Sequence, residues 1–250
     1  MPANDHPVEL KYLGHSTFIC TTPAGKKVLI DPWVSGNPAC PAAEKKLAQV
    51  DTMLITHGHF DHIYDAIAIG KQFKPQIGCI FEIAQWLKRK GVETASGMNK
   101  GGSQQLGDIR VTMVDARHSC GITEEDGSIV YGGEAVGYIV EFENGFKIYH
   151  AGDTCVFGDM KIIAELYEPD LALLPIGDLY TMSPKEAAYA CELMNARKVI
   201  PMHYATFPAL TGRPGQLADL VRRIGTQVLD LKPGETMLQT RLADSAPRVT

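Results

Sequence analysis

The sequence predicts an α/β protein made of two similar halves. Apolar strands and amphipathic helices alternate along its 250 residues, which is typical of βα units. A strand-turn-strand unit that ends in aspartate occurs at 18–31 and again at 137–153. The run DTMLITHGH, from Asp51, recurs as DLALLPIGD, from Asp170. We therefore expect two halves packed about a pseudo-twofold axis within a single domain, 1–250, with chance similarity between βα units as the alternative.

Short apolar runs and turn residues define the elements of the first half. Two strands flank a turn at Pro23–Gly25, and helical spacing of apolar residues begins just after a cluster of histidines. Gly91 is expected to end a second helix. The expected strands are Phe18–Cys20, Val28–Ile30, Met53–Ile55 and Ile77–Phe81, and the expected helices are Ile63–Phe73 and Ile83–Lys90.

Turn and cap residues place the elements of the second half in the same way. Asn144-Gly145 is typical of a hairpin turn, and Ser183 with Glu186 forms the capping box of a helix. The tail after Leu242 is expected to pack loosely. The expected strands are Arg110–Asp115, Val136–Phe142, Phe146–His150 and Leu171–Leu174, and a last helix is expected over Leu217–Ile224.

Composition narrows the classes of function and the setting. The chain is 45% hydrophobic and 21% charged, with a formal net charge of −5. This acidic balance gives no clear signal for binding to nucleic acid or to an anionic membrane. We therefore expect a small-molecule substrate. The composition is also compatible with a homo-oligomer. The N-terminus lacks the basic and apolar regions of a signal peptide. The 6 cysteines are scattered without a CxxC pair, which favours reduced thiols in the cytoplasm.

The segment LITHGHFDHIYDA, from Leu54, concentrates groups that bind metals. Residues i and i+2 of an extended segment point to the same side, so His57 and His59 can hold one ion together. Asp61 and His62 follow at the expected start of a helix and face a different direction. The spacing therefore predicts two neighbouring ions, each of which needs about three or four protein ligands.

Three residues that follow other strands suit the missing ligand positions. His118 comes directly after the strand that ends at Asp115, and His203 ends a second apolar run. Asp153 follows a strand through Ala-Gly, so a tight turn presents its carboxylate. We expect His118 on the first ion, His203 on the second and Asp153 as the bridge between them.

These residues resemble the ligand set of a known superfamily. The order HxHxDH, a lone histidine, Gly-Asp-Thr and a late histidine matches the metallo-β-lactamase superfamily across nearly the whole chain. The resemblance implies a four-layer αββα sandwich, with the site at one edge of two sheets. Details such as Gly14-His15-Ser16 are similar to the small metal-dependent hydrolases of that superfamily, among them ascorbate-6-phosphate lactonase and N-acyl phosphatidylethanolamine phospholipase D. The predicted metal ligands are His57, His59, Asp61, His62, His118, Asp153 and His203.

The expected activity is hydrolysis of a small ester, lactone or phosphoester by a metal-bridging hydroxide. The resemblance implies that Asp61 is also catalytic, orienting the nucleophile and handling its proton. Two divalent ions are expected as cofactors, with zinc favoured by the imidazole-rich ligand set and manganese or iron as alternatives. The competing functions are a phosphodiesterase or nuclease, an iron-dependent redox enzyme, and a metal-binding scaffold without activity.

The roles of several residues beside the expected ligands are less clearly indicated by the sequence. His15 either hydrogen-bonds a metal ligand or caps a turn. Asp31 is expected to be structural or to contact a ligand from outside. In the second half, Ile176 and Asp178 stand at the places of the first two histidines. We expect Ile176 to be packed among apolar side chains, and Asp178 either to fasten its loop or to lie near the site.

Overall fold

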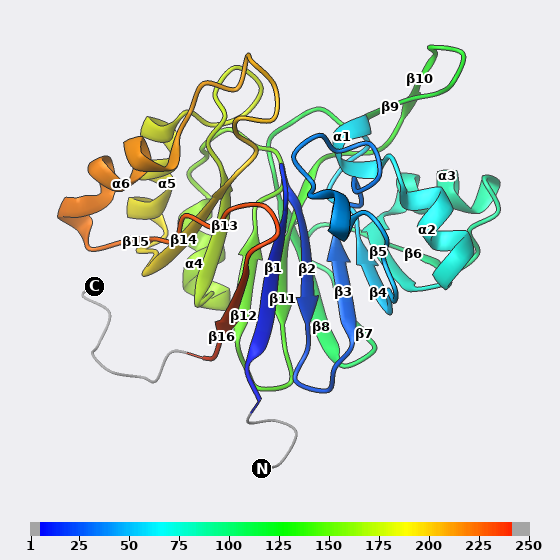
Figure 1. Ribbon diagram of the computed structural model, residues 1–250, viewed down its shortest axis with the longest axis horizontal. Helices are drawn as coiled ribbons and strands as arrows, with labels where there is room; N and C mark the ends of the chain where they lie inside the picture. Colours follow the sequence, from blue (N-terminus) through cyan, green and yellow to red (C-terminus); the bar gives the residue numbers. More distant parts are fainter. Residues whose placement is uncertain (1–5, 242–250) are drawn as a thin grey trace.

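The computed structural model describes residues 6–241, and two seven-stranded mixed sheets form its centre (Figure 1). The first sheet has the strand order β16-β1-β2-β3-β4-β5-β6. Its strands are β1 (Val8–Gly14), β2 (Thr17–Thr21), β3 (Lys27–Ile30), β4 (Thr52–Leu54), β5 (Gln76–Ile80), β6 (Ala95–Met98) and β16 (Thr236–Gln239). The second has the order β15-β14-β13-β12-β11-β8-β7. Its strands are β7 (Ser103–Leu106), β8 (Ile109–Asp115), β11 (Val136–Glu141), β12 (Lys147–His150), β13 (Leu171–Pro175), β14 (Lys198–Met202) and β15 (Gln227–Val228).

Helices cover the outer faces of the two sheets, which confirms the expected αββα sandwich (Figure 1). One buried cluster joins both sheets to α2 and α3, and a second joins the other face of the second sheet to α4, α5 and α6. The helices are α1 (Phe60–Ile63), α2 (Ala66–Phe73), α3 (Phe81–Arg89), α4 (Met160–Tyr167), α5 (Pro184–Leu193) and α6 (Pro214–Val221), with 3-10 turns at Ala42–Glu44 and Arg222–Ile224. The predicted capping box of Ser183 and Glu186 begins α5.

The pairing of the strands shows the duplication that the sequence predicts. In the first sheet, β16, β1, β2 and β3 pair antiparallel, and β3, β4, β5 and β6 pair parallel. In the second sheet, β7, β8, β11 and β12 pair antiparallel, and β12, β13, β14 and β15 pair parallel. The units 18–31 and 137–153 therefore occupy equivalent positions in the two sheets, as expected.

The expected helix over Ile63–Phe73 is wrong in one respect, because it is divided between α1 and α2. The helix is interrupted at Asp65, because the Asp65 backbone N–H donates to the carbonyl oxygen of Pro32 and not to a carbonyl of the preceding helical turn. The Asp65 carboxylate accepts the backbone N–H groups of Val34 and Ser35 at 2.6 and 2.8 Å. The loop after β3 thus competes with the helix for the polar groups of Asp65.

The loops that follow the parallel strands lie at one edge of both sheets, uppermost in Figure 1. Beside them, β9 (Gly121–Thr123) and β10 (Ile129–Tyr131) form a separate two-stranded hairpin. In the described part of the chain, no helix is long and apolar enough to cross a membrane. The tail after Leu242, expected to pack loosely, lies outside the described residues.

Candidate metal centre

The histidine cluster lies where β4 gives way to α1. His57 stands in the loop, His59 is the N-cap residue of α1, and Asp61 and His62 belong to its single turn. Gly58 separates the two histidines where a Cβ atom would come 2.5 Å from a side-chain carbon of Ile122. Only glycine leaves room for this approach of the loop to β9.

The other three candidate ligands arrive from the second sheet. His118 follows β8, Asp153 follows β12, and His203 follows β14. Gly152 has a φ of +63°, and a Cβ atom there would lie 2.6 Å from the carbonyl oxygen of Val136. Glycine is therefore required for the tight turn that presents the carboxylate of Asp153. All seven sequence-predicted ligands come from the loops and the short helix α1 at the common edge of the sheets.

His57, His59 and His118 form the first candidate group. Their facing nitrogens lie within 4.8 Å of one another. The Nδ1 atom of His59 is 3.0 Å from Nε2 of His57 and 3.2 Å from Nε2 of His118. Three imidazole nitrogens that converge in this way can take three positions around one ion.

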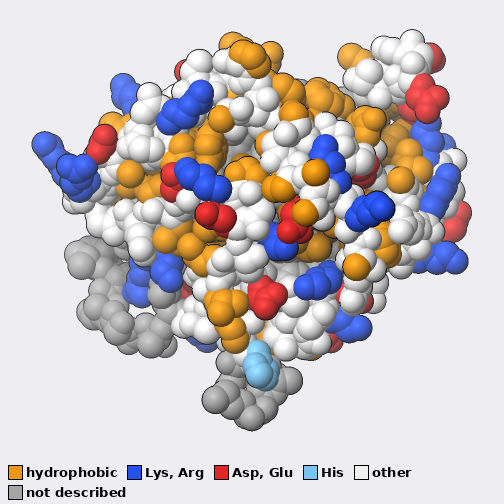
Figure 2. Space-filling view, in the orientation of Figure 1, with side chains coloured by type: hydrophobic (Ala, Val, Ile, Leu, Met, Phe, Trp, Pro, Cys, Tyr) orange, Lys and Arg blue, Asp and Glu red, His pale blue; other side chains and the backbone are white. Residues whose placement is uncertain are grey.

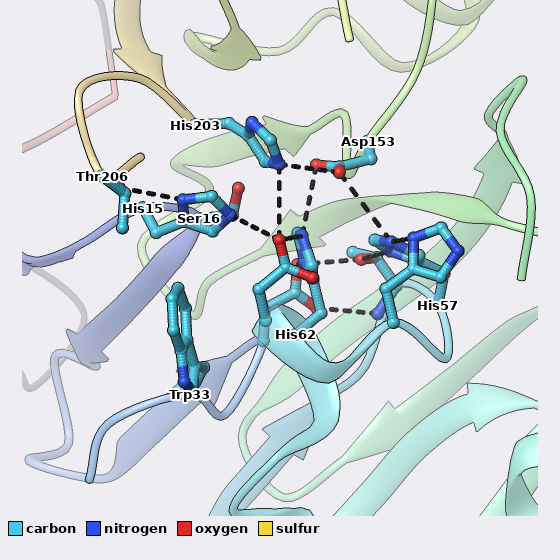
Figure 3. A network of polar contacts seen from close by, with 12 residues as sticks. His15, Ser16, Trp33, His57, His62, Asp153, His203 and Thr206 are labelled. Carbon is cyan, nitrogen blue, oxygen red and sulfur yellow. Dashed lines mark hydrogen bonds and ion pairs between the residues drawn. The ribbon is translucent and has the colours of Figure 1, made fainter. Parts of the chain in front are cut away.

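Asp61, His62 and His203 form the second candidate group, together with His15. The Oδ2 atom of Asp61 lies 3.7 Å from Nε2 of His203 and 4.0 Å from Nε2 of His62. The same oxygen is 2.9 Å from Nε2 of His15, and Nδ1 of His15 is 3.0 Å from the hydroxyl of Thr206 (Figure 3). Of the two roles expected for His15, contact with a candidate ligand is the observed one.

Asp153 lies between the two groups (Figure 3). Its Oδ2 atom is 2.9 Å from Nε2 of His203 and 3.7 Å from Nε2 of His118. Its Oδ1 atom is 3.3 Å from Nε2 of His62. The carboxylate thus contacts histidines of both candidate groups, which is the position expected of a bridging ligand.

Buried polar side chains orient two of the histidines from behind. Asp31 accepts from Nδ1 of His62 at 2.7 Å and from the amide and hydroxyl of Thr56, each at 2.8 Å. The Thr56 hydroxyl also lies 3.0 Å from Nδ1 of His57. These contacts occupy the Nδ1 atoms and leave the Nε2 atoms facing the centre, as outer partners of metal-binding histidines do. Sequence reasoning anticipated Asp31 in this position but missed Thr56.

The protonation states of the histidines in the first group are compatible with metal binding. Burial lowers the pKa of His57, His59 and His118, so these imidazoles are neutral near pH 7 and keep a lone pair for coordination. Burial also opposes the charged form of His62, but three carboxylates led by Asp153 outweigh it and raise the pKa of His62. Burial likewise opposes ionisation of Asp153, and the adjacent histidines nevertheless hold its pKa well below the usual value.

The donor set suits divalent transition metals. The Nε2 atom of His62 and the Oδ1 atom of Asp153 are buried without a hydrogen-bond partner among the described residues. Buried polar atoms of this kind normally have a partner, and an ion between them would supply it. Imidazole with carboxylate is the chemistry of zinc, manganese and iron sites. The residues present therefore fit the group that the ligand pattern implies.

The loop after β13 is the counterpart, in the second half, of the loop that carries His57 and His59. Its side chains differ from those histidines as the sequence predicts. Ile176 is fully buried in the cluster that joins the second sheet to α4, α5 and α6. Asp178 is exposed, and its carboxylate accepts the backbone N–H of Leu179 at 2.9 Å. Asp178 thus fastens its loop, which is one of its two expected roles, and Ile176 packs among apolar groups as expected.

A pocket of about 680 Å³ opens onto the centre. Its size is within the range of small-molecule sites. His57 and His62 lie behind it and are fully buried. The candidate ligands that line the pocket are His59, Asp61, His118, Asp153 and His203.

An αββα sandwich with histidine and aspartate ligands on the loops at the common edge of its sheets defines a metallo-β-lactamase-type protein. The chain matches the family model described as Beta-lactamase superfamily domain over residues 26–204. It is 56% identical over 229 residues to a UPF0173 metal-dependent hydrolase of Koribacter versatilis (strain Ellin345), covering 92% of this chain and 97% of that protein. Another, from Solibacter usitatus (strain Ellin6076), is 55% identical over 228 residues, covering 91% and 98%.

A solved structure gives the same result. The chain resembles Igni18, a metallo hydrolase from the hyperthermophilic archaeon Ignicoccus hospitalis KIN4/I, with a TM-score of 0.81 and 35% sequence identity. The match covers 94% of this chain and 99% of that one. The chain therefore belongs to the metallo-β-lactamase superfamily and, within it, to the metal-dependent hydrolases.

Proposed function

We propose that this metal-dependent hydrolase cleaves a small ester, lactone or phosphoester with two divalent ions bound side by side. The position of Asp153 carries the proposal, because its carboxylate contacts histidines of both candidate groups. The imidazole-rich set supports zinc, with manganese or iron as alternatives. The first ion would be held by His57, His59 and His118, the second by Asp61, His62 and His203, and both by Asp153.

Bound ions would lower the pKa of a shared water toward neutrality and stabilise negative charge on the substrate oxygen. The protein's own part is to position the reacting groups. Asp61 lines the pocket, and its carboxylate would orient the attacking water by accepting a hydrogen bond from it. Burial opposes ionisation of Asp61, but His62 and the hydrogen bond from His15 lower its pKa, so it remains a carboxylate acceptor near pH 7.

The setting of the enzyme is part of the same proposal. All six cysteines are free thiols, and five of them are buried. Free thiols that are not joined in pairs support a reducing, cytoplasmic environment. The pocket beside the candidate ligands supports a small-molecule substrate.

Metal-reconstituted protein tests the proposal directly. Metal-free protein is loaded separately with zinc, manganese or iron(II) and assayed with p-nitrophenyl acetate, a δ-lactone, bis(p-nitrophenyl) phosphate and single-stranded DNA. Oxygen consumption is recorded for each metal form. Turnover of at least one of the small-molecule substrates that a chelator removes and metal restores is the expected result. Turnover of nucleic acid alone would favour a nuclease, and oxygen consumption by the iron form alone would favour a redox enzyme. Stoichiometric metal binding without any turnover would favour a scaffold.

A further inference from the structure

The pocket above the candidate metal centre has an apolar wall. The wall combines α1, the loop after β13 and the loop after β14, so both halves contribute to it. The two other lining residues, Ser119 and Thr123, are neutral hydroxyl residues. Apart from the candidate ligands, no charged side chain lines this pocket in the described part of the chain. The apolar wall consists of Phe60, Tyr180, Phe207, Pro208 and Ala209.

The basic side chains of the loops near the pocket are held elsewhere. The guanidinium group of Arg117 lies 5.4 Å from the ring centre of Phe157, and its Nε atom is 3.7 Å from Asp115. Arg213 donates from Nη1 to two backbone carbonyl oxygens of its own loop, each at 2.7 Å. A phosphate or carboxylate on the distal part of a substrate would therefore find no cation on the pocket wall to compensate the loss of its hydration.

The apolar wall also reaches the surface. Phe60 is 56% and Tyr180 58% exposed. Hydrophobic side chains are visible along the upper edge of the molecule in Figure 2, above the sheets. Behind the wall, the rings of Trp33 and Phe207 stack at 5.8 Å, and Trp33 meets Phe60 edge-on at 5.7 Å. This aromatic support keeps the wall in place, and contiguous exposed apolar surface beside a site marks ligand binding.

From this lining we infer that the substrate is an ester or lactone whose organic part is uncharged and apolar. This inference rests on the proposed hydrolytic function and narrows its three substrate classes. The metal centre receives the scissile group, and the apolar wall receives the carbon chain attached to it. Anionic substrates, including phosphoesters with a further charged group, are disfavoured because their charge would lie against Phe60, Tyr180 and Phe207.

Hydroxamic acids test the inference by binding rather than by turnover. Their metal-binding group is constant, and the chain attached to it contacts the wall. Zinc-loaded protein is titrated with acetohydroxamic acid, octanohydroxamic acid and the monohydroxamate of suberic acid, which has the octanoyl length but ends in a carboxylate. Calorimetry gives the affinity. The change in tryptophan fluorescence, to which Trp33 contributes through its stacking on Phe207, gives a second signal.

Octanohydroxamic acid should bind at least about tenfold more tightly than the acetyl compound, since each buried methylene adds roughly a factor of four in affinity. It should also bind about tenfold more tightly than the carboxylated probe, because burial of an unpaired charge opposes binding. Equal affinities for the neutral and carboxylated probes, or no gain from acetyl to octanoyl, would overturn the inference. Chain-length-dependent binding without turnover of any ester, lactone or phosphoester would overturn the proposed function instead.

Two variants test whether the pocket lining causes the difference in affinity between the probes. Phe60→Ala should lower the affinity for the octanoyl probe severalfold more than the affinity for the acetyl probe. Thr123→Lys should reverse the preference and make the carboxylated probe the tighter ligand, since Thr123 is an exposed lining residue. Tyr189 is 55% exposed on α5 and does not line the pocket, so Tyr189→Ala and Tyr189→Lys are matched controls. Equal effects at Tyr189 and at the pocket positions would overturn the assignment.

Discussion

His62 lies between a carboxylate of the first half and a carboxylate of the second. Its Nδ1 atom faces Asp31 at 2.7 Å, and its Nε2 atom faces Asp153 at 3.3 Å. Asp31 directly follows β3, and Asp153 follows the corresponding strand β12 through Ala151 and Gly152, so loops at matching strand ends provide the two carboxylates. One carboxylate fixes the orientation of the imidazole from behind, while the other shares the centre with it.

The residue-scale prediction compares Asp153 with His15. Asp153→Ala should lose both metal affinity and activity to a greater degree than His15→Ala. The Asp153 carboxylate contacts both candidate groups, whereas the side chain of His15 hydrogen-bonds Asp61 alone among the predicted ligands. Loss of an outer partner typically costs about 10–100-fold. Metal titration and turnover measured side by side check the order. Equal losses, or a larger loss at His15, would mean that His15 is itself a ligand.

The seven candidate ligands could be predicted from the sequence because four of them cluster after one recognisable strand and the other three closely follow recognisable strands. His57 and His59 share a side of an extended segment, and that relation needs no tertiary information. The contacts of Thr56 with Asp31, of Trp33 with Phe207 and of Thr206 with His15 could not be predicted, because they join segments far apart in the chain. The hydroxyl of Thr206, for example, reaches His15 across 191 positions.

At the element scale, the same pair of hydrogen bonds precedes β4 in the first half and β13 in the second. The Asp51 carboxylate accepts the backbone N–H of Lys27 at 2.8 Å, and the Asp170 carboxylate accepts that of Lys147 at 2.9 Å. The amides of both aspartates donate back to the same lysine carbonyls at 2.9 Å. These reciprocal pairs fix the register of β3 with β4 and of β12 with β13. Asp51 and Asp170 are the first residues of the repeated run in the sequence. These hydrogen bonds explain why an aspartate stands at that position in both copies.

Asp51→Asn should lower the free energy of unfolding at pH 7 by about 1 kcal/mol, the size of one hydrogen bond to a charged group when partly exposed. Burial alone would raise the pKa of Asp51, but the Lys27 amide, Gln49 and Lys26 together lower it. A lowered folded-state pKa gives stability above the unfolded value near 3.9 that is lost as the pH falls through the folded value. Urea unfolding from pH 7 downward should therefore show the difference between variant and parent shrinking below about pH 4.

A matched control for this experiment is Glu165→Gln. Glu165 forms only an exposed pair with Lys161 within one helix, at 3.8 Å. Exposed pairs of this kind contribute roughly 0.3–0.5 kcal/mol. A pH-independent effect of Asp51→Asn would contradict the charged hydrogen bond as its cause.

A second element-scale prediction concerns the loops after β4 and β13. His59→Asn should drain the first ion, because it removes one of three converging imidazoles. Asp178→Asn should leave the metal content at two ions, with an effect on stability of roughly 1 kcal/mol or less, because an asparagine oxygen can still accept the N–H of Leu179. Elemental analysis of both reconstituted variants measures the difference. Complete metal loss in Asp178→Asn would show that the second half also binds metal.

For the molecule as a whole, the sequence indicates the inner strands better than the outer ones. The inner parallel strands β4, β5 and β13 are continuous apolar runs, which a sequence displays directly. The edge strands β7 and β16 contain mainly exposed or half-buried residues, and β10 alternates between exposed and half-buried positions. Their pairing depends on neighbours that are distant in sequence. The pocket wall could not be predicted for the same reason, since Phe60, Tyr180 and Phe207 come together only when both halves are folded.

The last prediction follows from the origin of the ligands in both halves. Four candidate ligands precede residue 63 and three follow residue 117, so two bound ions would join the halves across their common edge. A ligand that binds only the folded state adds about 2.7 kcal/mol when its concentration is 100 times its dissociation constant. Two such ions would add roughly 5 kcal/mol, which corresponds to about 10–20 °C in the melting temperature of a chain of this size.

Calorimetry of chelator-treated protein during stepwise return of zinc measures both the number of ions and their effect on stability. The melting temperature should rise until two equivalents have been added and then level off, and elemental analysis should find two ions per chain. His59→Asn provides the control, because only the second group keeps its full set of side chains and the rise should then level off near one equivalent. A plateau at one equivalent in the parent protein would contradict the dinuclear centre. It would leave Asp153 as a carboxylate that orients histidines rather than one that joins two ions.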